Sequence, residues 1–117
     1  MINGLHLLLF SRDAGADRAF LRDVLGWPHV EDEPGSGWLI FKTPPAEMGV
    51  HPTEGEPVTE AWLMCDDLDA TVADLTRQGV PVTAVSELGF GRVVHLTLPS
   101  GAQLGLYQPK HEVAHSL

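Results

Sequence analysis

Cysteine, basic side chains and long apolar runs are all scarce in this sequence of 117 residues. Its single cysteine excludes an internal disulfide and is typical of a protein from the reducing cytoplasm. The longest apolar run, "LLLF" at 7–10, is far too short to span a bilayer. Neither a basic run nor a small-residue cleavage site marks the first residues, so we expect no signal peptide. The sequence therefore predicts a cytoplasmic location.

Positive charge is also scarce, with 7 Lys and Arg against 16 Asp and Glu and a net charge of −9. Nucleic acids and anionic membranes both require a basic face on their partner, so we expect neither. The acidic balance remains compatible with a cationic ligand, with a metal ion or simply with solubility. The sequence also lacks a phosphate loop, a dinucleotide glycine fingerprint, a serine nucleophile elbow and a Cys-x-x-Cys pair.

What the sequence does contain is a repeat. "PAEMGVHP" at 45–52 and "GAQLGLYQP" at 101–109 share an interior glycine, Gly49 in one and Gly105 in the other. Two helical patterns are also alike. Each follows an aspartate and stops at a glycine and then a proline. Asp13 and Asp67 are good N-caps, and the glycines that follow the helices are good C-caps.

Strand patterns surround both predicted helices in the same order. In the first half we expect strands at 6–13, 29–32, 38–43 and 46–51, and in the second half at 60–67, 82–86, 92–98 and 102–107. Residues 52–58 join the two halves. The chain is thus predicted to be a β-α-β-β-β unit that occurs twice.

This pattern resembles the vicinal oxygen chelate superfamily, which includes glyoxalase I, bleomycin resistance proteins and extradiol dioxygenases. The resemblance covers residues 2 to 109 and is carried by "GLHLLLFSRDAGADRAFLRDVLGWP", "CDDLDATVADLTRQGV" and "LPSGAQLGLYQP". It implies a single α+β domain over 1–109, built from βαβββ modules at 2–52 and 58–109. The modules would form facing half-barrels around a central cavity, with the helices outside. We expect the tail at 110–117 to be mobile.

The resemblance also implies where a metal would bind, since metal-dependent relatives take ligands from the first and fourth strands of each module. Those positions here are His6, Gly49, Glu60 and Gly105. His6 and Glu60 can therefore bind one divalent ion (Fe, Mn, Ni or Zn) or can form an ion pair between the modules. Relatives usually have a glutamate where this chain has Gly105. A third ligand would then come from His95, His51 or Glu47.

Alternation along the strands predicts which side chains line the cavity, because successive residues face opposite sides. Leu63 and Cys65 would face the helices, which makes Cys65 a structural thiol. The expected polar lining is His6, Glu47, His51, Glu60, His95, Gln103 and Tyr107. The expected apolar lining is Leu8, Phe10, Leu39, Phe41, Trp62, Met64 and Phe90. Such an aromatic pocket with a few polar groups is typical of a small-molecule site.

Two functions remain open at this stage. One is a metal-assisted enzyme, dioxygenase-like or glyoxalase-like, acting on an oxygenated aromatic or dicarbonyl substrate, with Glu60 and Tyr107 as candidate catalytic residues. The alternative is a metal-free, ligand-sequestering protein of the bleomycin-resistance type. Glycines at two ligand positions favour this alternative, because they widen the pocket. The resemblance further implies a homodimer.

Overall fold

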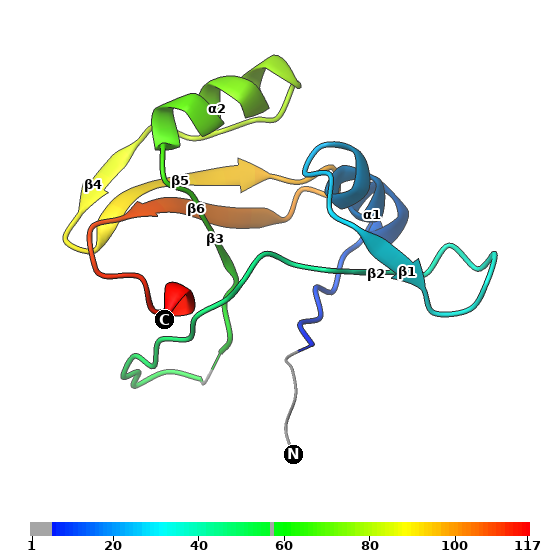
Figure 1. The fold of residues 1–117 in the computed structure, drawn as a ribbon, viewed down its shortest axis with the longest axis horizontal. Coiled ribbons are helices and arrows are strands. Elements are labelled where there is room, and N and C mark those ends of the chain that lie inside the picture. Colours follow the sequence, from blue (N-terminus) through cyan, green and yellow to red (C-terminus); the bar gives the residue numbers. More distant parts are fainter. Residues whose placement is uncertain (1–5, 57) are drawn as a thin grey trace.

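The computed structural model describes residues 6–56 and 58–117, with helices and strands in the order α1, β1, β2, β3, α2, β4, β5, β6 and the 3-10 helix η1 (Figure 1). This combination confirms the predicted α+β class. Residues 2–5 of the predicted first module, and residue 57 in the predicted joint, lie outside the described residues. In the described part of the chain, no helix is long and apolar enough to cross a bilayer.

Both helices begin at the predicted aspartates. Helix α1 spans Ala14–Asp23, and the Asp13 carboxylate accepts from the amide of Ala16 at 3.1 Å. Helix α2 spans Leu68–Arg77, and Asp67 accepts from the amide of Ala70 at 3.1 Å. Gly26 and Gly79, which follow the helices, have φ angles of 70° and 82°. Glycine adopts this left-handed backbone without strain, so both predicted helix ends are confirmed.

The second half of the chain forms a four-stranded sheet in the order β3–β6–β5–β4. Strand β3 (Trp62–Met64) is parallel to β6 (Gln103–Pro109), which is antiparallel to β5 (Gly91–Thr97). Strand β4 (Ser86–Leu88) starts where the predicted strand at 82–86 ends, and Val82 makes an isolated bridge to Leu96. The predicted β-α-β-β-β order is therefore present in this half.

The hydrophobic core lies between this sheet and helix α2. Leu68 of α2 and Leu96 of β5 are completely buried, and Phe20 of α1 joins the same cluster. The other buried members are Leu75, Val80, Val94, Leu98, Leu104 and Leu106. Leu63 and Cys65 pack against this cluster, as strand alternation predicts. Figure 1 shows that α2 covers one face of the sheet, so the alternate side chains of β5 and β6 point to the other face.

A buried aspartate connects helix α1 to the sheet. Asp17 is 4% exposed and accepts from the amide of Ser100 at 3.1 Å and from its hydroxyl at 2.7 Å. Ser100 lies in the turn between β5 and β6. Because a buried carboxylate is costly unless it is hydrogen-bonded, this contact fixes α1 at one end of the sheet.

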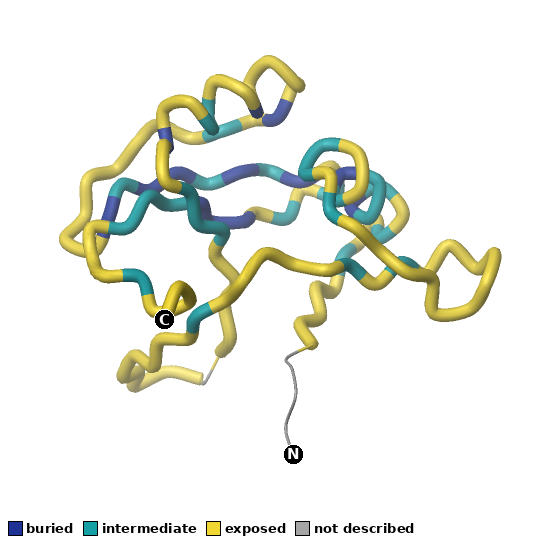
Figure 2. Tube along the Cα trace, viewed as in Figure 1, coloured by how far each residue is buried: buried dark blue, intermediate teal, exposed yellow. Residues whose placement is uncertain are grey.

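The first half of the chain departs from the prediction. It forms a two-stranded sheet from β1 (His29–Glu31) and β2 (Leu39–Phe41), and the predicted strands at 6–13 and 46–51 are absent from its described residues. Those two predictions were wrong for the single chain. A strand exists only where a partner edge satisfies its backbone, whatever its local propensity. Figure 2 shows 6–10 and most of 42–56 as exposed, in contrast to the sheet of the second half.

The C-terminal tail folds back onto the chain, and its expected mobility stays a prediction. Residues Ala114–Ser116 form η1, and their amides contact a side chain of the first half. Figure 1 places this tail on the side of the sheet opposite α2.

Candidate functional site

The face of the sheet opposite α2 carries an aromatic cluster. Trp62 of β3 and Tyr107 of β6 meet edge to face, with ring centroids 6.1 Å apart. Phe90, in the turn before β5, lies 6.5 Å from Trp62 and 5.6 Å from Tyr107. Trp62 is 37% exposed and Phe90 is 45% exposed. Trp62 and Phe90 therefore offer solvent an aromatic surface, and the partly buried Tyr107 borders it. Edge-to-face pairs stabilise the arrangement.

Gly105 gives the Trp62 indole its place on this face. In the strand register Gly105 lies between Trp62 on β3 and His95 on β5. A Cβ atom at Gly105 would overlap the six-membered ring of the indole. Because this position has no side chain, the indole lies across β6 and reaches His95, with ring centroids 5.3 Å apart. Glycine is unusual in the interior of a strand, and this close packing explains why Gly105 occurs there.

Glu60 is hydrogen-bonded to the same indole. Its Oε2 accepts from Nε1 of Trp62 at 3.1 Å. The sequence placed Glu60 at the start of a strand and assigned it as a metal ligand and catalytic group. In the structure the strand begins at Trp62, and the Glu60 carboxylate orients the indole ring.

In the single chain, the residues at the positions that the resemblance implies for a metal do not gather into a set of ligands. Within the described ranges, no group of three His, Cys, Asp or Glu side chains is close enough to hold an ion. The indole of Trp62 covers the position of Gly105, and Glu60 is hydrogen-bonded to that indole. His6 is exposed, and no ion pair joins it to Glu60 in the described part of the chain.

Tyr107 and Glu47, both predicted site residues, meet at the edge of the aromatic cluster. Burial raises the pKa of the Tyr107 phenol, and the negative charge of Glu47 and a hydrogen bond to it raise it further. Tyr107 Oη lies 3.2 Å from Nε2 of His111, which in turn lies 3.8 Å from a carboxylate oxygen of Glu47. Sequence reasoning missed His111, because nothing in a polar tail indicates where the tail folds back.

The remaining predicted residues divide into two groups. Met64 pairs with Tyr107 across the β3–β6 ladder, and Gln103 lies at the exposed start of β6. Phe41 instead contacts the ring of His29 at 5.7 Å. His51 is exposed beside Gly49. The structure thus brings together Glu47, Glu60, Trp62, His95 and Tyr107, and it does not join them to His6, Phe10, Phe41 or His51.

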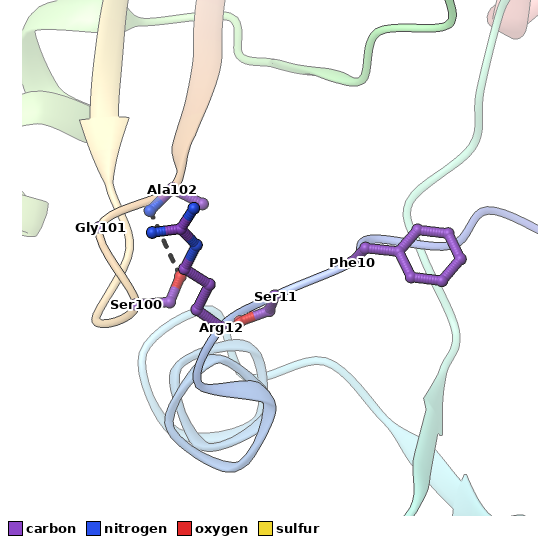
Figure 3. A pocket seen from close by; sticks show the side chains of 6 residues that line it. All are labelled: Phe10, Ser11, Arg12, Ser100, Gly101 and Ala102. Atoms are coloured by element: carbon purple, nitrogen blue, oxygen red, sulfur yellow. Dashed lines mark hydrogen bonds between the residues drawn. The ribbon is translucent and has the colours of Figure 1, made fainter.

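Phe10 belongs to a different part of the molecule. It is 90% exposed and borders a hollow of about 320 Å³ between the start of α1 and the β5–β6 turn. The other lining residues are Ser11, Arg12, Ser100, Gly101 and Ala102. Figure 3 shows the Phe10 ring pointing away from them. This hollow therefore lacks the converging aromatic rings of the face that carries Trp62.

Cys65 is structural, as expected. Its Sγ lies 3.7 Å from the carbonyl oxygen of Tyr107, and burial raises the pKa of the thiol. A raised pKa leaves little thiolate at neutral pH, which argues against a nucleophilic role.

No family model matches the chain, and no curated protein matches it. Several solved structures match the chain. An antibiotic binding protein, TnmS3 from Streptomyces sp. CB03234, is 26% identical over 94% of this chain and 100% of that one, with a TM-score of 0.64. A lactoylglutathione lyase from Agrobacterium tumefaciens is 18% identical over 91% of this chain and 92% of that one, with a TM-score of 0.64.

A third structure, a glyoxalase/bleomycin resistance protein from Streptomyces sp. CB03234, is 26% identical over 84% of this chain and 93% of that one, with a TM-score of 0.56. The likenesses extend over 84–94% of this chain and include a lyase and an antibiotic binding protein. The chain has the vicinal oxygen chelate fold. It shares that fold with members of the glyoxalase/bleomycin resistance/dioxygenase superfamily.

Proposed function

We propose that this protein binds a planar aromatic small molecule on the face formed by Trp62, Phe90 and Tyr107, without a metal and without chemistry on the ligand. The observation that carries the proposal is the position of the Trp62 indole over Gly105. Where metal-dependent relatives have a ligand, this chain has an aromatic ring. A flat exposed ring binds other flat rings by stacking.

Two further observations support the proposal. The net charge of −9 attracts a cationic ligand and favours its association. TnmS3, at 26% identity, is described as an antibiotic binding protein. In this proposal Glu60 and Tyr107 are not catalytic residues. Glu60 orients the indole, and Tyr107 forms one end of the aromatic face.

The test uses proflavine, a planar aromatic cation, and measures its affinity by calorimetry before and after EDTA treatment. We expect equal affinities in both conditions. Trp62→Ala should weaken binding by about tenfold or more, since a large stacking surface is lost. Trp38→Ala is the matched control, because Trp38 is also exposed but stacks on Arg18 at 4.9 Å.

The alternative, a metal-assisted enzyme, predicts a different result. Calorimetry with manganese, nickel, zinc and anaerobic iron(II) would then show binding of one ion per site, which His6→Ala would abolish. Affinity for one of these ions in the wild type that is absent in His6→Ala contradicts the proposal of metal-free binding. The absence of ion binding in both proteins agrees with it.

We also propose that two copies of the chain associate. Strand β3 pairs with β6 on one side only, and the apolar side chains of Leu8, Phe10, Met48 and Val50 are exposed in the single chain. Open strand edges and large exposed apolar side chains are both commonly covered by a partner. Light scattering at micromolar concentration should give twice the 12.7 kDa mass of one chain. A monomer mass would contradict this proposal.

A further inference from the structure

The C-terminal tail turns back across the aromatic face. It begins at Lys110, whose amide donates to the carbonyl of Phe90 at 2.8 Å. The Lys110 ammonium pairs with Glu87 at 3.2 Å, so the start of the tail is fixed on the β4–β5 turn. His111 then stacks near Tyr107, with ring centroids 6.0 Å apart. The tail therefore covers the Tyr107 end of the cluster, while Trp62 and Phe90 stay open.

Glu47 holds the far end of this tail. One of its carboxylate oxygens accepts from the amides of Ala114 at 2.7 Å and His115 at 3.4 Å. The other lies 3.8 Å from Nε2 of His111. The Glu47 side chain is only 15% exposed, although it lies in an otherwise exposed segment. A single carboxylate therefore contacts the tail at both His111 and η1.

The same contacts fix the segment 45–52. Among the hydrogen bonds of the described residues, only those of Glu47 connect this segment to the rest of the chain. Figure 1 shows the end of the tail beside this segment, on the side of the sheet opposite α2. Breaking the Glu47 contacts would free the tail and the segment together. Charge-assisted hydrogen bonds are among the stronger single contacts, so they suit a closing device.

We infer that the tail at 111–117 and the segment 45–52 form a latch, fastened by Glu47, that closes over the Tyr107 end of the aromatic face and limits ligand exchange. The inference rests on the proposed function for its ligand, but the latch itself is a property of the free protein. The raised pKa of Tyr107 agrees with it, because burial and the Glu47 charge are its causes.

The first experiment needs no ligand. Glu47→Ala should increase the exchange of the Ala114 amide about tenfold, since one charge-assisted hydrogen bond corresponds to about that factor or more. It should also raise the relaxation of the Tyr107 ring protons by a neutral gadolinium chelate, because the phenol becomes accessible. Glu47→Gln should give an intermediate result, because it keeps an acceptor but loses the charge.

Glu112→Gln is the matched control, since it removes one negative charge from the same tail without touching Glu47. It should behave as wild type in both measurements. If Glu47→Ala leaves the Ala114 amide and the Tyr107 ring unchanged, the latch is refuted, whatever the protein binds.

The second experiment measures proflavine exchange by stopped flow. A latch slows entry and exit alike, so Glu47→Ala should raise the association and dissociation rate constants by a similar factor, about tenfold, with little change in Kd. A rise in the dissociation rate alone would show that the tail is only a ligand contact and would refute the gating role. Failure of proflavine to bind wild type would refute the proposed function, while the ligand-free experiment still decides the latch.

Discussion

The two halves of this chain share a sequence pattern, but only the second half builds a full sheet from it. The second half forms a four-stranded sheet with a buried core, whereas the first half forms a capped helix and a two-stranded sheet with exposed segments on either side. The helix caps are equal in the two halves, and the sheets are not. A repeat therefore determines local structure twice, but it does not ensure that each copy buries its strands within one chain.

The largest expected difference between the halves is in core stability. Leu96 in β5 is 0% exposed, whereas Ile40, its counterpart in β2, is 39% exposed. Leu96→Ala should lower the free energy of unfolding by about 2–5 kcal/mol, and Ile40→Ala by about 1 kcal/mol or less. Urea unfolding of both variants measures this. A cost at Ile40 as large as at Leu96 would show that a second chain covers the first half.

Replacing Gly105 or its counterpart Gly49 by alanine should have different effects on stability. Gly105→Ala places a Cβ against the Trp62 indole, so we expect a loss of about 1–3 kcal/mol and a changed tryptophan environment. At Gly49 the nearest atom is Nε2 of His51 at 3.6 Å, an ordinary contact, so Gly49→Ala should stay within about 0.5 kcal/mol. Urea unfolding and near-UV circular dichroism would report both. Equal effects would mean that the indole does not occupy the Gly105 position.

The helix caps should respond alike. Asp13→Ala and Asp67→Ala each remove one carboxylate that accepts an amide at 3.1 Å. Each should cost about 1 kcal/mol of stability, with unchanged proflavine affinity. The comparison is made by thermal unfolding and calorimetry. A variant with unchanged stability and abolished binding would contradict the assignment of its aspartate as a cap.

The smallest effect concerns the single tyrosine of the chain, which has His51 as its counterpart in the first half. Because the folded-state pKa of Tyr107 is raised, the folded chain favours the protonated phenol. Its contribution to stability is fully present below the ordinary pKa of about 10 and is lost as the pH rises through the raised value. Absorbance titration should give a higher midpoint for folded protein than for protein in urea.

Glu47→Gln should lower that midpoint only in part, because burial is the larger cause of the raised pKa. Glu112→Gln should leave it unchanged. A folded midpoint equal to that of the unfolded chain would show that the phenol is not buried against the tail.

Much of the second half could be predicted from sequence. Strand alternation placed Leu104 and Leu106 toward the helix and Tyr107 toward the opposite face, and this arrangement is confirmed. The same reasoning failed for 6–13 and 46–51, since their patterns predict strands but identify no partner edge. For the site, alternation found Trp62 and His95 but not the contact between them, which depends on Gly105 in the strand between.

The sequence by itself determined the two capped helices, the strand order of the second half and the face on which the residues of β5 and β6 lie. These features depend on residues a few positions apart, so local hydrogen bonding and alternation are sufficient. Only the tertiary structure decided that Trp62 covers Gly105, that Asp17 joins Ser100, and that Glu47 meets the tail. Those contacts join segments distant along the chain, and their formation depends on which edges and surfaces the folded chain brings together.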